Sequence, residues 1–371
     1  MAEANPYEVA LTFLPGIGSQ TVRHLVSYCG SPQAVFATPA GKLQKIPGIG
    51  PKLLRQITDN TRQALLEAEQ VIKKADEQQV QLLFYTSAAY PDRLKQIADA
   101  PVLLYFRGNA NLNQQHIVSI VGTRKPTSYG QAVTERIVEE LKQHQVMVVS
   151  GLAYGVDIIS HRAALQQGLP TVGVMASGQD IIYPSVHRRY AEKMIEQGGI
   201  LTEGTFGTKP DAHRFPARNR IIAGMSDCTI VVEAAMKSGT LITADIAHSY
   251  DREVMAVPGN INSSVSEGTN FLIKSNKAAV YTSAQDLVEL LNWDLEYRRQ
   301  EKKAAVNSLS REDFSPEEWQ VLQVLEKTKE EQMDNLSWKA QVPVSQLASL
   351  LLGLEFKGVV KALPGKRFAL V

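Results

Sequence analysis

The chain has 371 residues, of which 44% are hydrophobic and 21% are charged, a composition typical of a soluble protein with two or three domains. Because 39 basic and 38 acidic residues give a net charge of +1, a nucleic acid would have to bind a local basic patch rather than a globally basic surface. The N-terminus does not resemble a secretory signal and no apolar run is long enough to span a bilayer, so with two cysteines, Cys29 and Cys228, we expect a cytoplasmic protein with reduced thiols and no membrane contact.

The first region, residues 1–80, contains an internal repeat. Leu14–Gly18 reads Leu-Pro-Gly-Ile-Gly, Ile46–Gly50 reads Ile-Pro-Gly-Ile-Gly, and each copy precedes apolar residues at helical spacing. This pattern predicts a helical domain of two helix-hairpin-helix motifs, whose glycines let backbone N–H groups approach a phosphate. The candidate contacts are Gly16, Gly18, Gly48 and Gly50. The alternative is a small helical bundle that uses Pro-Gly only as a turn.

The second region, residues 82–293, alternates apolar runs with amphipathic segments, which predicts an α/β fold with an extended Rossmann-like parallel sheet covered by helices. The predicted strands are Ile117–Val121, Val146–Ser150, Thr171–Met175, Ile200–Thr202, Cys228–Glu233, Val254–Val257 and Ala279–Tyr281. Helices between them include Tyr129–Gln143, Asp157–Gln167, Ser185–Gln197 and Leu241–Ser249. The apolar segment Ala278–Trp293 either forms a subunit interface or closes the edge of the sheet.

Polar residues gather where the predicted strands end, and ligands of such sheets bind beyond these carboxyl ends. Arg124 follows the first strand, Ser150, Gly151 and Gly155 follow the second, and Lys237–Thr240 follow the fifth. The glycine spacing does not fit a dinucleotide fingerprint and no P-loop occurs, so neither a bound dinucleotide nor ATP hydrolysis is indicated. We expect Gly151 and Gly155 to line a phosphate path, with Lys237, Ser238, Gly239 and Thr240 at a helix start.

The run Phe215–Gly224 places Arg218, Asn219 and Arg220 at the mouth of an apolar helix, with Pro216 in the turn before it. Arginine forks and first-turn N–H groups both bind phosphate. The alternative is a surface loop whose arginines pair with carboxylates. Three acidic residues nearby, Asp157, Glu203 and Glu233, would either orient the arginines or act on a glycosidic bond.

The last part of the chain divides into a charged linker, 294–314, and a region of helix and wing patterns, 315–371. Ser315–Glu318 predicts a capped helix start, Val344–Val360 predicts a helix-turn-helix, and Leu363–Phe368 predicts a short wing. This region has seven acidic and seven basic residues, so charge gives no support for tight duplex binding and a protein-interaction module is the alternative.

Seven segments in order resemble the DNA-processing protein A family, DprA/Smf. They are Val121–Arg124, Ser150–Asp157, Ser177–His187, Phe215–Gly224, Val231–Ala234, Lys237–Thr240 and Val257–Gly259. Residues Tyr90–Ile97 and Leu104–Asn109 also resemble the segment that this family places before its Rossmann-like core, and 315–371 resembles its winged-helix tail. The likeness is strong over 82–293 and looser at both ends.

The resemblance implies a non-enzymatic protein that binds and protects single-stranded DNA during natural transformation and helps to load the RecA recombinase. It also implies a homodimer, and no catalytic residue, cofactor or metal is expected. Carried over by motif, the DNA pocket consists of Arg124, Ser150, Gly151, Arg218, Asn219, Arg220, Lys237, Ser238, Gly239 and Thr240. Binding without sequence preference needs backbone contacts and base stacking, for which Tyr154 and Phe215 are candidates.

An enzyme is the alternative function. Nucleotide phosphoribohydrolases share a related core, with a double-glycine turn and an Arg–Glu pair that attack a nucleoside monophosphate. Here the corresponding turn is Lys-Ser-Gly-Thr, preceded by Glu233, and it lacks the double glycine. This difference weakens the hydrolase hypothesis without removing it.

Overall fold

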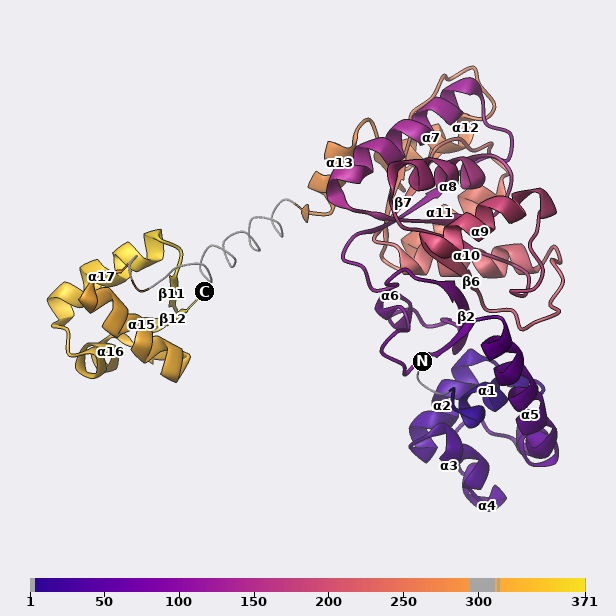
Figure 1. The fold of residues 1–371 in the computed structure, drawn as a ribbon, viewed down its shortest axis with the longest axis horizontal. Helices are drawn as coiled ribbons and strands as arrows, with labels where there is room; N and C mark the ends of the chain where they lie inside the picture. The colour runs from indigo at the N-terminus through magenta and orange to yellow at the C-terminus, as the bar shows by residue number, and fades with distance from the viewer. Residues whose placement is uncertain (1–3, 294–310, 312–313, 371) are drawn as a thin grey trace. The chain divides into compact units, whose positions relative to one another are not determined.

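A computed structural model describes residues 4–293, 311 and 314–370, and the chain divides into two compact units, 1–287 and 288–371 (Figure 1). The charged segment 296–303, predicted as part of a linker, lies outside the described residues. Within the part that is described, no helix combines the length and apolar character needed to cross a bilayer.

One sheet organises the first unit, and its nine strands among the described residues lie in the order β1-β2-β6-β5-β4-β3-β7-β8-β9. The strands are β1 Gln81–Phe84, β2 Leu103–Gly108, β3 Ile117–Val121, β4 Met147–Gly151, β5 Thr171–Val174, β6 Gly198–Thr202, β7 Cys228–Val231, β8 Glu253–Ala256 and β9 Ala279–Val280. From β6 to β9 all neighbours are parallel, which confirms the predicted fold class. Strands β1 and β2 extend one edge with antiparallel pairing that we did not predict.

Helices cover both faces of this sheet. They are α6 Asp92–Lys95, α7 Ser128–Leu141, α8 Val156–Gln167, α9 Arg188–Glu196, α10 Arg214–Met225, α11 Gly239–Ser249, α12 Glu267–Lys274 and α13 Ala284–Leu290, with short 3-10 turns at Lys142–His144 and Ser185–His187. Helix α8 packs between α7 and α9, whereas α10 packs against α6 and α11. The strand order reverses between β3 and β7, which makes the carboxyl ends of these two strands the topological switch point.

Most predicted strand boundaries shift by one or two residues, and two differences from the predictions affect residues of the candidate site. Helix α10 begins at Arg214, so Pro216 lies in its first turn and not before it, a position where the missing N–H of proline costs no hydrogen bond. Strand β7 ends at Val231, so Glu233 lies in the following loop. The sheet ends at β9. In the segment Ala278–Trp293, predicted either to form a subunit interface or to close the sheet edge, Leu287 and Trp293 are buried and Val280 is 41% exposed.

The N-terminal helices contain two hairpins with the same backbone geometry. The elements are α1 Pro6–Ala10, a 3-10 turn at Leu11–Phe13, α2 Ser19–Cys29, α3 Pro32–Ala37, α4 Ala40–Leu43 and α5 Pro51–Glu77. Gly16 and Gly48 occupy equivalent turn positions with φ of 71° and 83°, which L-residues rarely adopt. Gly18 and Gly50 are the N-caps of α2 and α5, so the predicted helix-hairpin-helix pair is confirmed.

These helices pack directly on the first two strands. Leu25 and Ile57 belong to the same hydrophobic cluster as Phe84 and Tyr105. Lys74 of α5 also forms a 2.8 Å ion pair with Asp180 from the loop after β5. The hairpins and the edge of the sheet therefore form one continuous surface.

The second unit is a winged helix, as predicted. It contains α15 Pro316–Thr328, α16 Met333–Ala340 and α17 Val344–Phe356, with a sheet of β10 Glu330–Gln332, β12 Arg367–Leu370 and β11 Val360–Leu363. Ser315 and Glu318 cap α15 reciprocally, which confirms the capped start read from the sequence. Its core consists of Val321, Leu325, Leu336, Leu347, Leu351, Leu354 and Val360, among others.

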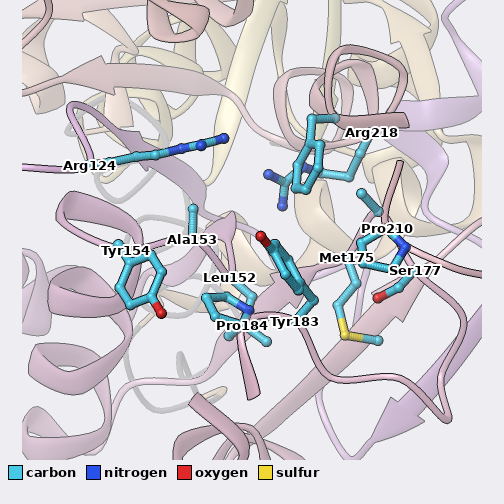
Figure 2. A pocket seen from close by; sticks show the side chains of 12 residues that line it. Arg124, Leu152, Ala153, Tyr154, Met175, Ser177, Tyr183, Pro184, Pro210 and Arg218 are labelled. Atoms are coloured by element: carbon cyan, nitrogen blue, oxygen red, sulfur yellow. The ribbon is translucent and has the colours of Figure 1, made fainter. Parts of the chain in front are cut away.

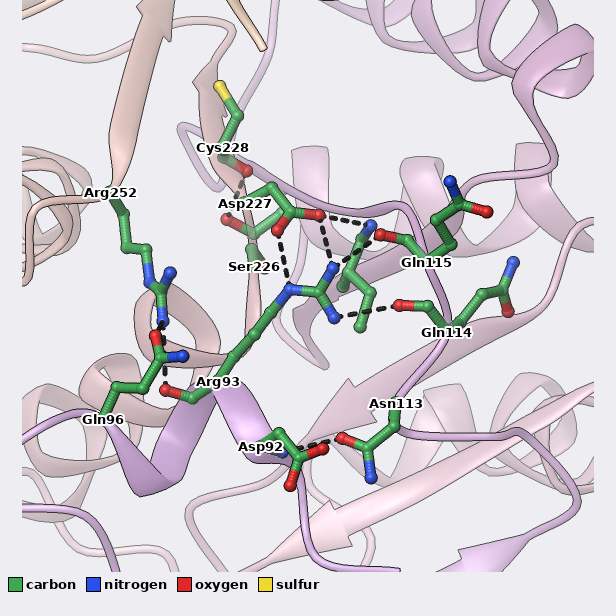
Figure 3. A network of polar contacts seen from close by, with 12 residues as sticks. Asp92, Arg93, Gln96, Asn113, Gln114, Gln115, Ser226, Asp227, Cys228 and Arg252 are labelled. Carbon is green, nitrogen blue, oxygen red and sulfur yellow. Dashed lines mark hydrogen bonds and ion pairs between the residues drawn. The ribbon is translucent and has the colours of Figure 1, made fainter. Parts of the chain in front are cut away.

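A polar network holds helix α6 against the amino ends of β3 and β7 (Figure 3). Arg93 donates to both carboxylate oxygens of Asp227, at 2.7 and 2.8 Å, and to the carbonyls of Gln114 and Gln115. Asp227 also accepts a 2.9 Å bond from the backbone N–H of Ile117, the first residue of β3. One carboxylate thus connects three segments of the chain.

We expect Asp227→Ala to lower the free energy of unfolding by about 3 kcal/mol, because it leaves a largely buried guanidinium without its carboxylate. Asp92→Ala is the matched control. The exposed Asp92–Lys95 ion pair lies in α6, the helix that also carries Arg93, and it should contribute less than about 1 kcal/mol to stability. Urea denaturation of both variants measures the difference, and equal effects would contradict the role given to Asp227.

Candidate nucleic-acid interface

A cleft of about 580 Å³ opens at the switch point of the sheet, and we call it the strand-end cleft. It is bounded by the loops that follow β3 and β4, by one face of α10 and by the start of α11. The lining residues include Gly122, Thr123, Arg124, Ala153, Asp157, Phe215, Arg218, Asn219, Ser238, Gly239 and Thr240. Most of these residues belong to motifs that are far apart in the sequence, and the fold brings them together.

Arg218 forms the floor of the cleft and is 8% exposed. Its Nη1 donates to the carbonyl of Val174 at the end of β5, and its Nε donates to Asn219 Oδ1 at 3.2 Å. Burial lowers the pKa of Arg218 and raises that of the neighbouring Asp157, while the attraction between the two charges opposes both shifts. The floor is therefore a buried cation that one carboxylate partly compensates.

Two glycines allow this arrangement. A Cβ at Gly151 would overlap the Asp157 carboxylate and the Arg218 guanidinium, so only glycine fits between them. Gly155 has φ of 79°, and a Cβ there would overlap the backbone of Thr123 and Arg124. The loops after β3 and β4 consequently lie in direct contact, which fixes the backbone that carries Arg124.

Arg124 is exposed at the mouth of the cleft. Its guanidinium lies 5.7 Å from the ring centre of Phe215, and in Figure 2 the Arg124 and Arg218 side chains extend toward the same space from opposite sides. Two arginines at different depths give the cleft a positive wall and a positive floor, which suits a polyanion.

An aromatic pocket of about 80 Å³ adjoins the cleft and shares Arg124, Ala153, Phe215 and Arg218 with it (Figure 2). Tyr154 and Tyr183 line this pocket and are about half exposed. The Tyr183 and Phe215 ring centres lie 6.1 Å apart. We predicted Tyr154 and Phe215 as aromatic candidates but missed Tyr183, although it lies within the segment Ser177–His187 of the family resemblance.

The first turn of α11 contributes backbone and hydroxyl groups. Ser238 is its N-cap, yet its side chain caps no helical N–H. Within the described residues, Ser238 Oγ is buried without a hydrogen-bond partner. Gly239 and Thr240 also line the cleft, and the N–H groups of a first helical turn have no partner within the helix. This helix end therefore presents donors to the cleft.

Outside the hairpins, five predicted site residues line neither the strand-end cleft nor the aromatic pocket. Two of them, Gly151 and Gly155, lie behind the lining and provide close approach of the segments that carry it. The other three are Ser150, Arg220 and Lys237. Ser150 is buried in β4 and donates a 2.6 Å hydrogen bond to the carbonyl of Ile120. Arg220 turns away from the cleft and forms a 2.5 Å ion pair with Glu203. Lys237 is exposed and lines neither the strand-end cleft nor the aromatic pocket.

The acidic residues on which a hydrolase would depend are engaged in the fold. Glu233 is 2% exposed and accepts bonds from the N–H and Oγ1 of Thr127, at 2.9 and 2.6 Å. Glu203 is paired with Arg220, and Asp157 faces Arg218. This arrangement favours orientation of loops and arginines over attack on a glycosidic bond.

The four hairpin glycines lie outside the strand-end cleft and the aromatic pocket. Gly18 lines a separate groove between the first hairpin and the edge of the sheet. The backbone of both hairpins has the predicted form, but the two hairpins face different surroundings.

Comparison with known families gives matches along the chain. Residues 81–292 match the family model described as DNA recombination-mediator protein A, 8–63 match the SAM-like helix-hairpin-helix tandem, and 304–366 match the DprA winged helix domain. The chain is 35% identical over 286 residues to Protein Smf of Escherichia coli K12, covering 75% of this chain and 74% of that protein. It is 40% identical over 199 residues to the DNA processing protein DprA of Streptococcus pneumoniae R6, covering 54% and 70%.

Two solved structures are also similar. The X-ray structure of DprA from Streptococcus pneumoniae superposes with a TM-score of 0.67 at 31% identity, covering 77% of this chain and 98% of that one. DprA from Helicobacter pylori, whose structure describes a single-stranded DNA binding mode, gives a TM-score of 0.53 at 31% identity and covers 58% and 97%.

Proposed function

The chain belongs to the DNA recombination-mediator protein A family, DprA/Smf, as its seven ordered motifs predict, and from this premise we propose that it binds single-stranded DNA in the strand-end cleft. The observation that carries the proposal is the convergence of Arg124, Arg218 and the first turn of α11 on one cleft. The single-stranded DNA binding described for the Helicobacter pylori relative supports it.

In this proposal the phosphates lie against the two arginines and the donors of Ser238–Thr240. The bases stack on Phe215, Tyr183 and Tyr154 in the adjoining aromatic pocket. Such contacts do not depend on base identity, because they use the backbone and the ring faces rather than the base edges. Ser150, Arg220 and Lys237, which the family resemblance includes in the pocket, would then act through the fold or at its margin.

We also propose that binding serves a non-enzymatic, cytoplasmic role, in which the protein protects the strand and helps to load RecA during natural transformation. The name of the matching family, a recombination mediator, supports a role beside a recombinase. We propose further that the protein forms a homodimer. We also propose that the chain divides into a helical domain, 1–80, a Rossmann-like domain, 82–293, a linker, 294–314, and a winged-helix domain, 315–371.

Anisotropy titrations of a labelled single strand and a matched duplex, across a salt series, test the proposal. We expect Arg124→Ala to weaken single-strand binding about tenfold and to reduce the salt slope by about 0.7, the value for one lost phosphate contact. Arg136→Ala is the matched control, because it removes the same charge from an exposed position on α7. Lys237→Ala should have a smaller effect than Arg124→Ala.

Equal losses in Arg124→Ala and Arg136→Ala would show that the overall charge, and not the cleft, determines binding. Failure of the parent protein to bind the single strand at low salt would overturn the proposal. Incubation with AMP tests the enzymatic alternative, and the release of free adenine would contradict a non-enzymatic role.

A further inference from the structure

We propose that the bound strand continues beyond the strand-end cleft into the groove between the first hairpin and the edge of the sheet. The first hairpin, and not the second, would then hold DNA. This inference rests on the proposed function, and it assigns a second contact region to the same strand.

The groove, which we call the hairpin groove, has a volume of about 310 Å³, within the range of small-ligand sites. One wall consists of Phe13, Ile17 and Val22 of the first hairpin, and the other includes Leu103 and Tyr105 of β2. The loop Gly204–Thr208, which follows β6, forms its rim. In Figure 1 the N-terminal helices lie beside β2.

A smaller cavity of about 80 Å³ lies between the groove and the cleft and shares lining residues with both. It is lined by Arg218, which also lines the cleft, and by Arg214, which also lines the hairpin groove. Met175 and Thr202, immediately beyond β5 and at the end of β6, form its base. The three spaces therefore follow each other along one end of the sheet, at the carboxyl ends of β3 to β6 and the amino end of the antiparallel β2, and one extended chain can occupy them in sequence.

The chemistry of the hairpin groove suits a nucleotide. Arg214 contributes a cation that is 43% exposed and lies 4.0 Å from the carboxylate of Asp211, a weak pairing that leaves it available. Gly18 and Ser19 begin the 11-residue helix α2 at the groove, so first-turn N–H groups face the same space as the rings of Phe13 and Tyr105. A phosphate and a base can thus be bound together.

One carboxylate lies where the smaller cavity meets the groove. Glu203 lines both spaces, but it accepts a 2.5 Å bond from Arg220 Nη2. The pairing gives Arg220 a role outside the cleft, because its positive charge neutralises the Glu203 carboxylate, which would otherwise repel a phosphate bound beside it.

The second hairpin provides a matched comparison within the same molecule. Its Gly48 and Gly50 repeat the geometry of Gly16 and Gly18, and Pro51 begins α5 as Ser19 begins α2. None of the residues Ile46–Lys52 lines the hairpin groove. The two hairpins therefore differ in position and not in backbone form.

The test is the dependence of affinity on strand length. Labelled oligothymidylates of about 4 to about 16 nucleotides are titrated into the full chain at low salt. We expect the affinity of the parent to keep rising after the cleft is filled. Ser19→Glu should leave the affinity for the shortest strand unchanged and weaken the longest by about fivefold, because a carboxylate then faces the phosphates.

Lys52→Glu is the control in the second hairpin. It changes the charge by two units rather than one, yet it should leave the length dependence of the parent unchanged. Glutamate in a first helical turn favours the helix, so both variants should remain folded. Arg214→Ala should repeat the effect of Ser19→Glu on long strands.

Equal effects of Ser19→Glu and Lys52→Glu, or a parent affinity that does not rise with length, would overturn the inference while leaving short-strand binding in the cleft intact. Absence of binding by the parent at every length would instead overturn the proposed function, on which this inference rests.

Discussion

Arg218→Met is expected to weaken single-strand binding by about tenfold to a hundredfold, the range for losing hydrogen bonds to a charged group. The same substitution should lower the free energy of unfolding by about 3 kcal/mol, because it leaves the buried Asp157 without the cation that faces it. Anisotropy titration and urea denaturation measure the two effects independently.

A second substitution separates binding from stability. In the double variant Arg218→Met/Asp157→Asn, no buried charge is left without a partner, so most of the lost stability should return. Binding should remain weak, since the floor of the strand-end cleft no longer carries a cation. A double variant that binds like the parent would remove Arg218 from the binding site, and a fully stable Arg218→Met would show that the two charges are not coupled.

Acidification from pH 6.5 to pH 4 should cost the fold about 3 kcal/mol through His161. This side chain of α8 is buried against β4 and β5, where its Nε2 donates to the Gly151 carbonyl and its Nδ1 lies 2.7 Å from Thr171 Oγ1. Burial lowers the pKa of His161 to about 4, and the nearby His187 and Arg218 act in the same direction. Because the unfolded chain binds a proton near pH 6.5 and the folded chain does not, stability falls as the pH decreases through this interval.

His161→Gln isolates this contribution, since glutamine keeps a donor and an acceptor but does not titrate. Unfolding free energies of both proteins are measured between pH 4 and pH 7. Carboxyl groups such as Asp157 titrate in both, so their effects cancel in the difference. Parallel curves for the parent and the variant would contradict the assignment to His161.

Helical geometry explains why Arg218 of α10 reaches the strand-end cleft and Arg220 of the same helix does not. Successive residues of an α-helix are about 100° apart, so Arg218 and Arg220 point to nearly opposite sides of α10. Phe215, Arg218, Asn219 and Ile222 follow the i, i+3, i+4, i+7 pattern, and all four line the cleft. This selection was available from the sequence once the helix was placed.

Other features depended on contacts that no local pattern contains. The hydroxyl of Ser150 bonds within the sheet, since the neighbouring strand places the Ile120 carbonyl beside it. The pairing of β2 with β6 joins segments distant in the chain, and the apolar run Leu103–Gly108 alone does not reveal its partner. By contrast, the repeated hairpins, the parallel core and the capped start of α15 each followed from short motifs whose backbone requirements are local.

The position of β2 between β1 and β6 has a consequence for synthesis of the chain. Its register places Tyr105 opposite Thr202, so the partner strand is translated 97 residues later. At typical elongation rates, an interval of roughly 5 to 20 s separates the two strands on the ribosome. During this time the N-terminal helices can already cover β1 and one face of β2. The other edge of β2 stays unpaired until β6 emerges, and such an open strand edge favours pairing with other chains during synthesis.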